Sequence, residues 1–154
     1  MSDIEAALQA QGVSLPNPST PAGSYVPVVR TGNLLYVAGQ IPMGPDGPQY
    51  IGRCGENVSL EDAQAAAKLC AMNILAQVKN AIGSLDKVSR IVKLNGYVNS
   101  TPAFTDHPKV VNGASDFLVS IFGDKGRHAR AAVGVAALPL GVSVEVEAIV
   151  EIES

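Results

Sequence analysis

The sequence predicts an α+β fold in which two helices cover one face of a sheet. Two segments, 60–81 and 106–122, repeat apolar residues at helical spacing, and each has a glycine within two residues of its end, Gly83 and Gly123. The last segment, 142–152, alternates apolar and polar residues, as a strand with one buried face does. Along the chain the predicted order is β-β-α-β-α-β-β, which sets two helices against four or five strands.

Length and composition predict a single domain that hides part of its surface. The chain has 154 residues, and no shift in composition divides it. It is 47% hydrophobic but only 16% charged and 5% aromatic, with no Trp. We therefore expect a core of Val, Ile, Leu and Ala, and an oligomer that covers part of the apolar surface.

Charge and cysteine content exclude several function classes. The net charge is −3 and no Lys/Arg cluster is present, which argues against nucleic-acid binding. The acidic start lacks the features of a signal peptide, and no apolar run reaches the ~20 residues that a membrane helix needs. Cys54 and Cys70 are too few for a metal site and are expected to be reduced thiols, with Cys70 packed on a helix. We expect a cytoplasmic protein that contacts no membrane.

The chain divides into an N-terminal arm, 1–20, and a domain, 21–154. Within the arm, residues 2–12 fit a short amphipathic helix. The stretch 16–23 then holds three prolines and a glycine, which break regular structure. We expect this stretch to be a surface connection.

A hairpin and a long loop open the domain. Strands are predicted at 25–30 and 34–39, joined by Thr31-Gly32-Asn33, where Gly32 can take a positive φ. The following stretch, 40–58, is rich in Gly and Pro. Because a loop this long is unusual inside a small domain, we expect it to have a functional role or to act as a lid.

The first long helix opens at Ser59, whose side chain can cap the first turn, with Asp62 three residues on. Its apolar stripe runs from Leu60 to Ala81, and Gly83 is a natural stop. A strand follows, in which four alternating residues are predicted on one side: Val92, Leu94, Gly96 and Val98.

The second helix begins near Asp106 and Pro108, an acidic cap followed by a first-turn proline, and ends at Gly123. Two strands, 128–137 and 142–152, complete the chain, and we expect them to form a hairpin through Leu-Pro-Leu-Gly. The valine side of the last strand should meet the helices. The opposite side combines glutamates with small residues of the preceding strand, Ala132, Gly134 and Ala136, and suits contact with another subunit.

Five polar residues are candidates for chemistry. Arg130 places a permanent charge at the mouth of a small, apolar strand; it is either a carboxylate clamp or part of a structural salt bridge. Glu145 is either a proton donor and acceptor whose pKa burial would raise, or an exposed edge residue. Tyr25, at a loop-to-strand junction, is either cleft lining or core. His107 and His128 flank turns and are interpreted as solvated histidines.

Three stretches carry a family resemblance: PAGSYVPVVRTGNLLYVAGQIP, NGYVNSTPAF and ARAAVGVAALPLGVSVEVEAI. They are similar to the Rid/YjgF family of reactive-intermediate (imine/enamine) deaminases, also labelled the endoribonuclease L-PSP family. The resemblance runs over 21–152. It implies a chorismate-mutase-like fold with one mixed sheet, a homotrimer around a central barrel, and ligand clefts between subunits.

The resemblance also implies roles for individual residues. Arg130 resembles the family's carboxylate-binding arginine, and Glu145 the glutamate that handles protons or positions water. Tyr25 resembles a tyrosine that lines the cleft. Gly39 resembles the backbone site beside the ligand, and Asn112 an asparagine near the cleft.

Two departures from the deaminase subgroup remove polar groups. Ala131 and Ala132 stand where that subgroup has Ser-Cys, and Ala38 stands where it has serine. The loop from Gly44 to Val58 and the N-terminal arm are also longer. The substrate implied by the resemblance is a small carboxylate whose identity the sequence leaves open.

The implied reaction is hydrolysis of a 2-imino acid to a keto acid and ammonia, without a metal or an organic cofactor. Arg130 would anchor the carboxylate, and Glu145 or a backbone carbonyl near Ala132 would orient water and move the proton. Two alternatives stay open. The cleft could bind a small carboxylate without catalysis, or the protein could be an endoribonuclease, which the acidic charge disfavours.

The expected hairpin constrains where these residues meet. With a four-residue connection, Arg130 would pair near Glu151 on the same face as Glu145. Glu145 would then lie six residues back, on the order of 20 Å at ~3.3 Å per residue. We therefore expect a working cleft to combine Arg130 of one subunit with Glu145 of its neighbour.

Overall fold

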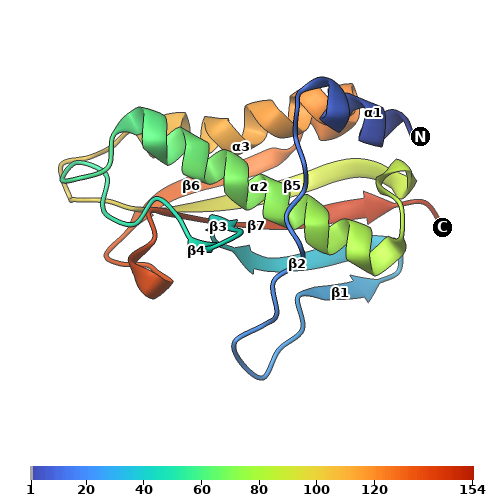
Figure 1. Cartoon of the computed structure of the whole chain (residues 1–154), viewed down its shortest axis with the longest axis horizontal. Helices are drawn as coiled ribbons and strands as arrows, with labels where there is room; N and C mark the ends of the chain where they lie inside the picture. Colours follow the sequence, from blue (N-terminus) through green and yellow to red (C-terminus); the bar gives the residue numbers. More distant parts are fainter. Residues whose placement is uncertain (1) are drawn as a thin grey trace.

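The computed structural model describes residues 2–154 and shows a sheet with its helices on one face (Figure 1). The strands lie in the order β1-β2-β7-β5-β6, and β5 pairs with β6 in parallel while the other neighbours are antiparallel. The predicted α+β architecture is confirmed, and the sheet is mixed. The sheet strands are β1 (Val28–Thr31), β2 (Leu34–Gln40), β5 (Val88–Asn99), β6 (Ala129–Val135) and β7 (Val144–Ile152).

Three α-helices accompany the sheet, and two of them form the layer that covers it. These two are α2 (Leu60–Ile82) and α3 (His107–Phe122); the third, α1 (Asp3–Ala10), lies beside α3. A small ribbon, β3 (Met43–Gly44) and β4 (Gly47–Pro48), interrupts the long loop before α2. No helix within residues 2–154 has both the length and the apolar character needed to cross a bilayer.

The core fills the space between the sheet and the two long helices. The predicted valine side of β7 is buried there, which confirms the alternation. Cys54 and Cys70 are free and buried, and burial raises the pKa of both thiols. The buried side of β7 and its approach consists of Val142, Val144, Val146, Ala148, Val150 and Ile152.

The predicted helix ends are close to those observed. The Ser59 hydroxyl accepts a hydrogen bond from the Asp62 amide at 3.1 Å, and α2 stops at Gly83. Helix α3 follows Asp106 and ends at Gly123, as expected. However, the Asp106 carboxylate makes no capping hydrogen bond, so only its position, and not its capping role, was predicted correctly.

The first hairpin has the predicted turn but a later start. Thr31 pairs with Leu34 across Gly32, whose φ is +57°. Strand β1 begins at Val28 rather than at residue 25, because Pro27 has no amide to donate to a ladder. Residues 21–27 instead form part of a loop that projects beyond the edge of the sheet (Figure 1).

The expected hairpin between 128–137 and 142–152 is wrong. Strand β6 pairs in parallel with β5, and β7 lies between β2 and β5. Helix α3 connects β5 to β6 and provides the crossover that a parallel pair requires. Strand β7 therefore lies at the centre of the sheet, and β6 lies at its edge.

Two predictions about which face of the sheet a side chain lies on are wrong, one in β6 and one in β5. Ala132 packs against the core, and a Cβ at Gly134 would overlap the His107 ring, so these small residues face the helix layer rather than the Glu145 side. In β5, Ile91 is buried and Val92 is only half-buried. The pairing of β5 with β7 shifts between Ile91 and Lys93, and this irregularity reverses the expected alternation.

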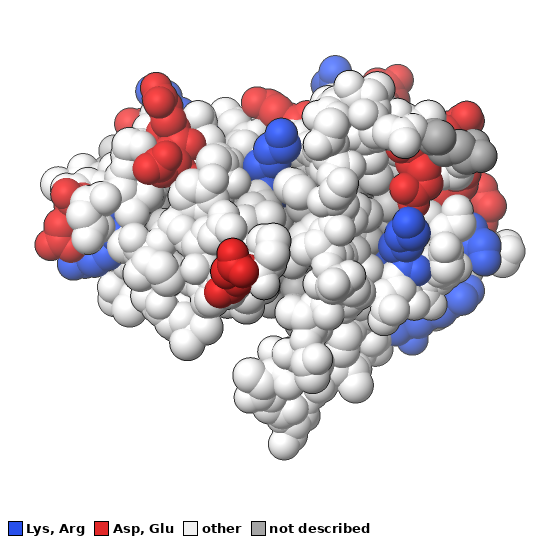
Figure 2. All heavy atoms as spheres, in the orientation of Figure 1, with Lys and Arg blue, Asp and Glu red and all other residues white. Residues whose placement is uncertain are grey.

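The N-terminal arm packs against the domain. Leu8 is buried in the core, the Ile4 amide donates to Asp86, and Gln11 donates to Ser120 at 3.0 Å. From residue 13 to 29 the chain carries no charged residue. Figure 2 shows the projecting loop as an uncharged protrusion. The division of the chain at residue 20 stays a prediction.

Helices α2 and α3 approach closely at Gly113, where a Cβ would overlap the Gln64 carbonyl oxygen and lie 2.8 Å from its carbon. We expect Gly113→Ala to lower the free energy of unfolding by about 1–2 kcal/mol, because forced overpacking against backbone outweighs the gain in helix propensity. Chemical denaturation measures this. The exposed α3 residue Asp116 provides the control: Asp116→Ala should change stability by less than about 0.5 kcal/mol. An unchanged midpoint for Gly113→Ala would show that the helices can separate freely.

Candidate functional site

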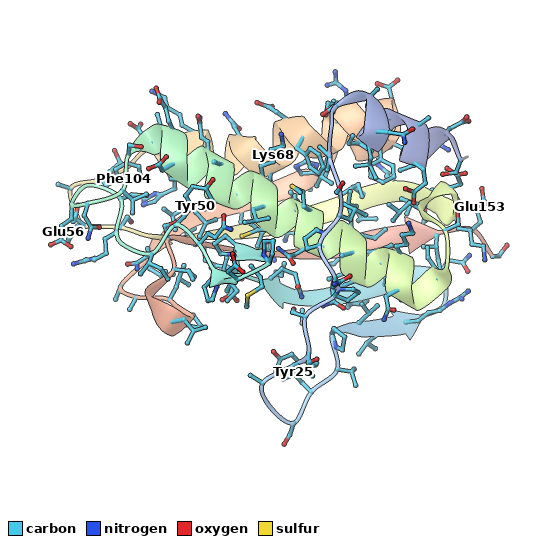
Figure 3. All side chains as sticks on the ribbon, viewed as in Figure 1. Tyr25, Tyr50, Glu56, Lys68, Phe104 and Glu153 are labelled. Carbon is cyan, nitrogen blue, oxygen red and sulfur yellow. The ribbon has the colours of Figure 1, made fainter. Side chains whose placement is uncertain are left out.

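A cleft of about 460 Å³ lies between β2, the projecting loop and the turn that precedes β7. Tyr25, Gly39 and Glu145, three of the predicted site residues, line it. Tyr25 is 54% exposed at the end of the loop (Figure 3), so it is not a core residue. Leu140 forms part of the opposite wall and holds a left-handed φ of +59°, a strained conformation for leucine.

Glu145 and Gly39 are in direct contact across two neighbouring strands. A Cβ at Gly39 would overlap the Glu145 carboxylate, so only glycine lets this side chain lie against β2. Glu145 is half-buried, and burial together with the nearby Glu147 charge raises its pKa. The carboxyl group is therefore suited to holding and releasing a proton closer to neutral pH than an ordinary glutamate.

Two buried glutamines form a polar base beneath the cleft, and the sequence interpretation missed both. Gln77 is 2% exposed and donates to the Ser19 carbonyl at 3.0 Å. Gln40 is 5% exposed and donates to the Ala38 carbonyl at 3.0 Å. Gln77 lies within the apolar stripe of α2, and that misplaced polarity was the available signal. Together these residues fix the arm over the cleft.

Arg130 lies at the edge strand, in a separate group of residues. Its guanidinium donates to Asn112 Oδ1 at 2.8 Å, to Ser115 Oγ at 3.1 Å and to the Pro108 carbonyl at 3.3 Å. These acceptors are all neutral. Within residues 2–154 no carboxylate lies within 4 Å of Arg130, so the structural salt bridge considered above does not form in the chain.

The two histidines are held by hydrogen bonds rather than solvated as expected. His128 Nε2 contacts Ser115 Oγ at 2.8 Å, and its Nδ1 donates to the Gly126 carbonyl at 2.6 Å. Burial lowers the pKa of His128, and the charge of Arg130 adds to this effect. His107 Nε2 contacts Ser100 Oγ at 3.0 Å.

The side chains of Arg130 and Glu145 lie on opposite faces of the sheet. Arg130 aligns with Leu94 of β5, which aligns with Ala148 of β7, three residues from Glu145. The two Cα positions are thus about 10 Å apart across the strands and about 10 Å along them. Arg130 reaches helix α3, whereas Glu145 faces away from the helices. The expected register, with Arg130 near Glu151 on the face of Glu145, is wrong because β6 does not touch β7.

The face of the sheet opposite the helices combines polar and apolar groups. Tyr97 hydrogen-bonds to Glu147, and this bond together with burial raises the pKa of Tyr97 to about 12. Large apolar side chains are exposed beside them: Val29 at 52%, Tyr36 at 45% and Val133 at 46%. Such an apolar face suits contact with another protein surface. Among residues 2–154, no three His, Cys, Asp or Glu side chains gather as metal ligands would.

A protein-family model described as "YjgF/chorismate_mutase-like, putative endoribonuclease" matches residues 5–152. The chain belongs to the YjgF family. The assignment suggested by the three sequence stretches is thereby confirmed, and the observed sheet and helices fit the chorismate-mutase-like fold.

Proteins from several organisms are similar to this chain. Protein TCP17 of Trypanosoma cruzi is 47% identical over 98% of this chain and 95% of its own. A 2-iminobutanoate/2-iminopropanoate deaminase of Dermatophagoides farinae is 33% identical over 92% of this chain and 95% of its own. The crystal structure of Atu1372 from Agrobacterium tumefaciens, a protein of unknown function, superposes with a TM-score of 0.93 at 49% identity; the match covers 98% and 93% of the two chains.

The raised pKa of Glu145 predicts a pH-dependent effect on stability. Because the folded state holds this proton more tightly than the unfolded chain, Glu145 destabilises the fold increasingly as pH rises above the ordinary carboxyl pKa. We expect Glu145→Gln to raise the free energy of unfolding at pH 7 and to raise it less at pH 4. Urea denaturation at both pH values measures the difference. The exposed Glu151 of the same strand is the control, and an equal gain from Glu151→Gln would contradict the assignment to burial.

Proposed function

We propose that this YjgF-family protein hydrolyses 2-imino or enamino acids to 2-keto acids and ammonia, in clefts between the subunits of a homotrimer. The observation that carries the proposal is the half-buried Arg130 guanidinium, which is held by neutral acceptors and has no carboxylate partner within the described chain. The similarity to a relative named 2-iminobutanoate/2-iminopropanoate deaminase supports it.

Arg130 is organised to receive a carboxylate. A guanidinium has five N–H donors, and three of them are used by Asn112, Ser115 and the Pro108 carbonyl. The two that remain can bind both oxygens of a substrate carboxylate. The neighbouring acceptors hold the planar guanidinium in place but are neutral. The positive charge of Arg130 therefore remains available to the ligand.

Glu145 supplies the proton chemistry in this proposal. Water adds to the carbon of the C=N bond, and the Glu145 carboxylate accepts a proton from that water. The protonated carboxyl group gives this proton to the nitrogen, which forms a carbinolamine. The carboxylate then takes the second proton, from the carbinolamine hydroxyl, and passes it to the nitrogen as the C=O bond forms and the C–N bond breaks, so that ammonia leaves and a keto acid remains. A raised pKa suits a group that must perform both steps. Tyr25 and the Gly39 backbone line the space in which the imine would lie.

The separation of the two groups supports an inter-subunit cleft. Within one chain Arg130 and Glu145 lie on opposite faces, too far apart for one small ligand. Edge strand β6 carries Arg130, and the open face carries exposed Tyr36 and Val133. A homotrimer with its open faces turned toward a central barrel would cover that apolar surface and bring Arg130 of one subunit to Glu145 of the next.

One feature favours a second candidate, a module that binds keto acids without catalysis. Ala132, two residues beyond Arg130, carries no polar side chain, and neither does Ala38 beside Gly39. Measuring ammonia release from 2-iminobutanoate, together with binding of 2-oxobutanoate, separates the two functions. Binding without accelerated imine decay would support the module and contradict the deaminase.

We expect Arg130→Lys to lower kcat/KM for imine hydrolysis by about tenfold or more, because an ammonium cannot form the planar two-bond fork. The fold should survive, since Arg130 lies near the start of an edge strand. Stopped-flow measurement of imine decay gives the rates. Arg127→Lys changes an exposed arginine just before β6 and should leave the rate unchanged. Near-wild-type turnover in Arg130→Lys would show that the fork is not needed.

Mixed assembly tests the shared cleft. Random 1:1 mixing of Arg130→Ala and Glu145→Ala subunits should restore about a quarter of wild-type activity, because a quarter of the clefts receive both intact residues. No recovery in confirmed mixed trimers would place both residues in one chain's site or remove Glu145 from the reaction. Mixing wild type with the double variant is the control. It should retain about a quarter of wild-type activity for a shared cleft, against about half for a site within one chain.

A further inference from the structure

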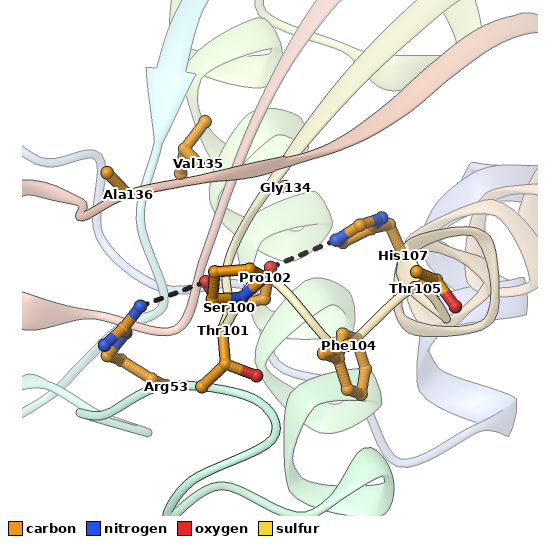
Figure 4. Close-up of a pocket in the computed structure, with 10 residues that line it drawn as sticks. All are labelled: Arg53, Ser100, Thr101, Pro102, Phe104, Thr105, His107, Gly134, Val135 and Ala136. Carbon is orange, nitrogen blue, oxygen red and sulfur yellow. Dashed lines mark hydrogen bonds between the residues drawn. The ribbon is translucent and has the colours of Figure 1, made fainter.

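A second cavity, of about 370 Å³, lies where β5 and β6 end and α3 begins (Figure 4). It shares no lining residue with the cleft that holds Glu145, and the proposed reaction does not use it. One wall is polar, with Arg53, Ser100 and His107. The rest is largely apolar and includes Phe104 and Val135.

Arg53 is held in place by its own loop. Its amide donates to Asn57 Oδ1 at 2.7 Å, and its carbonyl accepts from the amides of Asn57 and Val58 at 3.0 and 3.1 Å. The next amide, of Cys54, donates to the Asn99 carbonyl at 2.8 Å and ties the loop to the end of β5. The long loop before α2 therefore delivers a pre-positioned cation to the cavity.

The Arg53 guanidinium has unused hydrogen-bonding capacity. One of its terminal nitrogens donates to the Ser100 carbonyl at 3.2 Å, as Figure 4 shows. Its Nε is buried and has no hydrogen-bond partner. Within residues 2–154 no carboxylate lies within 4 Å of Arg53. Because a buried donor without an acceptor is costly, this group favours an anionic ligand.

Ser100 and His107 form a second polar group beside Arg53. Ser100 Oγ and His107 Nε2 are 3.0 Å apart, and the Phe104 and His107 rings pack in a T-shaped arrangement with their centres 5.7 Å apart. A Cβ at Gly134 would overlap His107 Nε2 and lie 2.7 Å from Ser100 Oγ, so glycine at this position permits the pair. With its hydrogen on Nε2, His107 donates to Ser100 and leaves the hydroxyl hydrogen free for a ligand.

We propose that this cavity binds a small organic carboxylate with a short apolar group. Arg53 and the Ser100 hydroxyl would hold the two carboxylate oxygens, and Phe104 and Val135 would contact the apolar part. Inorganic phosphate fits less well, since Arg53 is the one Lys or Arg in the lining and part of the wall is apolar. The proposal does not depend on the deaminase activity.

Nuclear magnetic resonance can test binding on the intact chain, because its sequence holds just two histidines. His107 reports on this cavity, and His128, through Ser115, reports on the surroundings of Arg130. We expect titration with butanoate, at fixed pH and ionic strength, to shift the His107 imidazole signals to saturation. No His107 shift at tens of millimolar butanoate would overturn the proposal.

Variants assign the response to Arg53. Arg53→Ala, or the milder Arg53→Gln should the alanine variant misfold, is expected to raise the dissociation constant measured at His107 by about tenfold or more. Unchanged His128 signals in the ligand-free variant show that the fold is intact. The matched variant Arg130→Ala should leave the His107 response unchanged. A response that survives loss of Arg53, or disappears with loss of Arg130, contradicts the site, and stronger binding of inorganic phosphate than of butanoate contradicts the ligand class.

Discussion

The position of β7 at the centre of the sheet is the constraint on which the other features depend. Its even-numbered residues are buried against the helices, and the odd-numbered residues between them face the other way. Strict alternation thus puts Glu145 on the open face, and pairing with β2 brings it against Gly39. Because β7 bonds to β2 and β5, it has no free side; β6 pairs with the free side of β5, and Arg130 becomes an edge residue.

The same arrangement explains how a charge is accommodated in a strand of small residues. At the edge, Arg130 lies over the first turns of α3, where Asn112, Ser115 and the Pro108 carbonyl accept its hydrogen bonds. Small residues such as Ala132 allow the helix and strand to approach closely. The guanidinium keeps its charge uncompensated, which costs stability unless a ligand or a neighbouring subunit supplies an anion.

Local patterns predicted the helices well, because Ser59, Gly83 and Gly123 act through the first or last turn of a helix. The pairing of β6 could not be read in this way, since a strand's partner is set by the whole sheet rather than by its neighbours in sequence. Sequence reasoning named Arg130 and Glu145, the residues on which the proposed site rests, but placed them in the wrong register. It missed Arg53, which lies in a glycine-rich loop. The sequence of that loop does not show that hydrogen bonds to Asn57 and Asn99 hold the loop so that Arg53 lies beside Ser100.

Arg53 and Arg130 share one physical property: each is partly buried, hydrogen-bonded to neutral oxygens and without a carboxylate within 4 Å in the described chain. The chain is acidic, with 14 Asp and Glu against 11 Lys and Arg, so partners of opposite charge are not scarce. An arginine retained in such surroundings forgoes the stabilisation that an ion pair with good geometry can give. This loss of stabilisation is understandable where the anion comes from outside the chain, as we propose for both arginines: Arg130 lies on an edge strand and Arg53 lines a cavity.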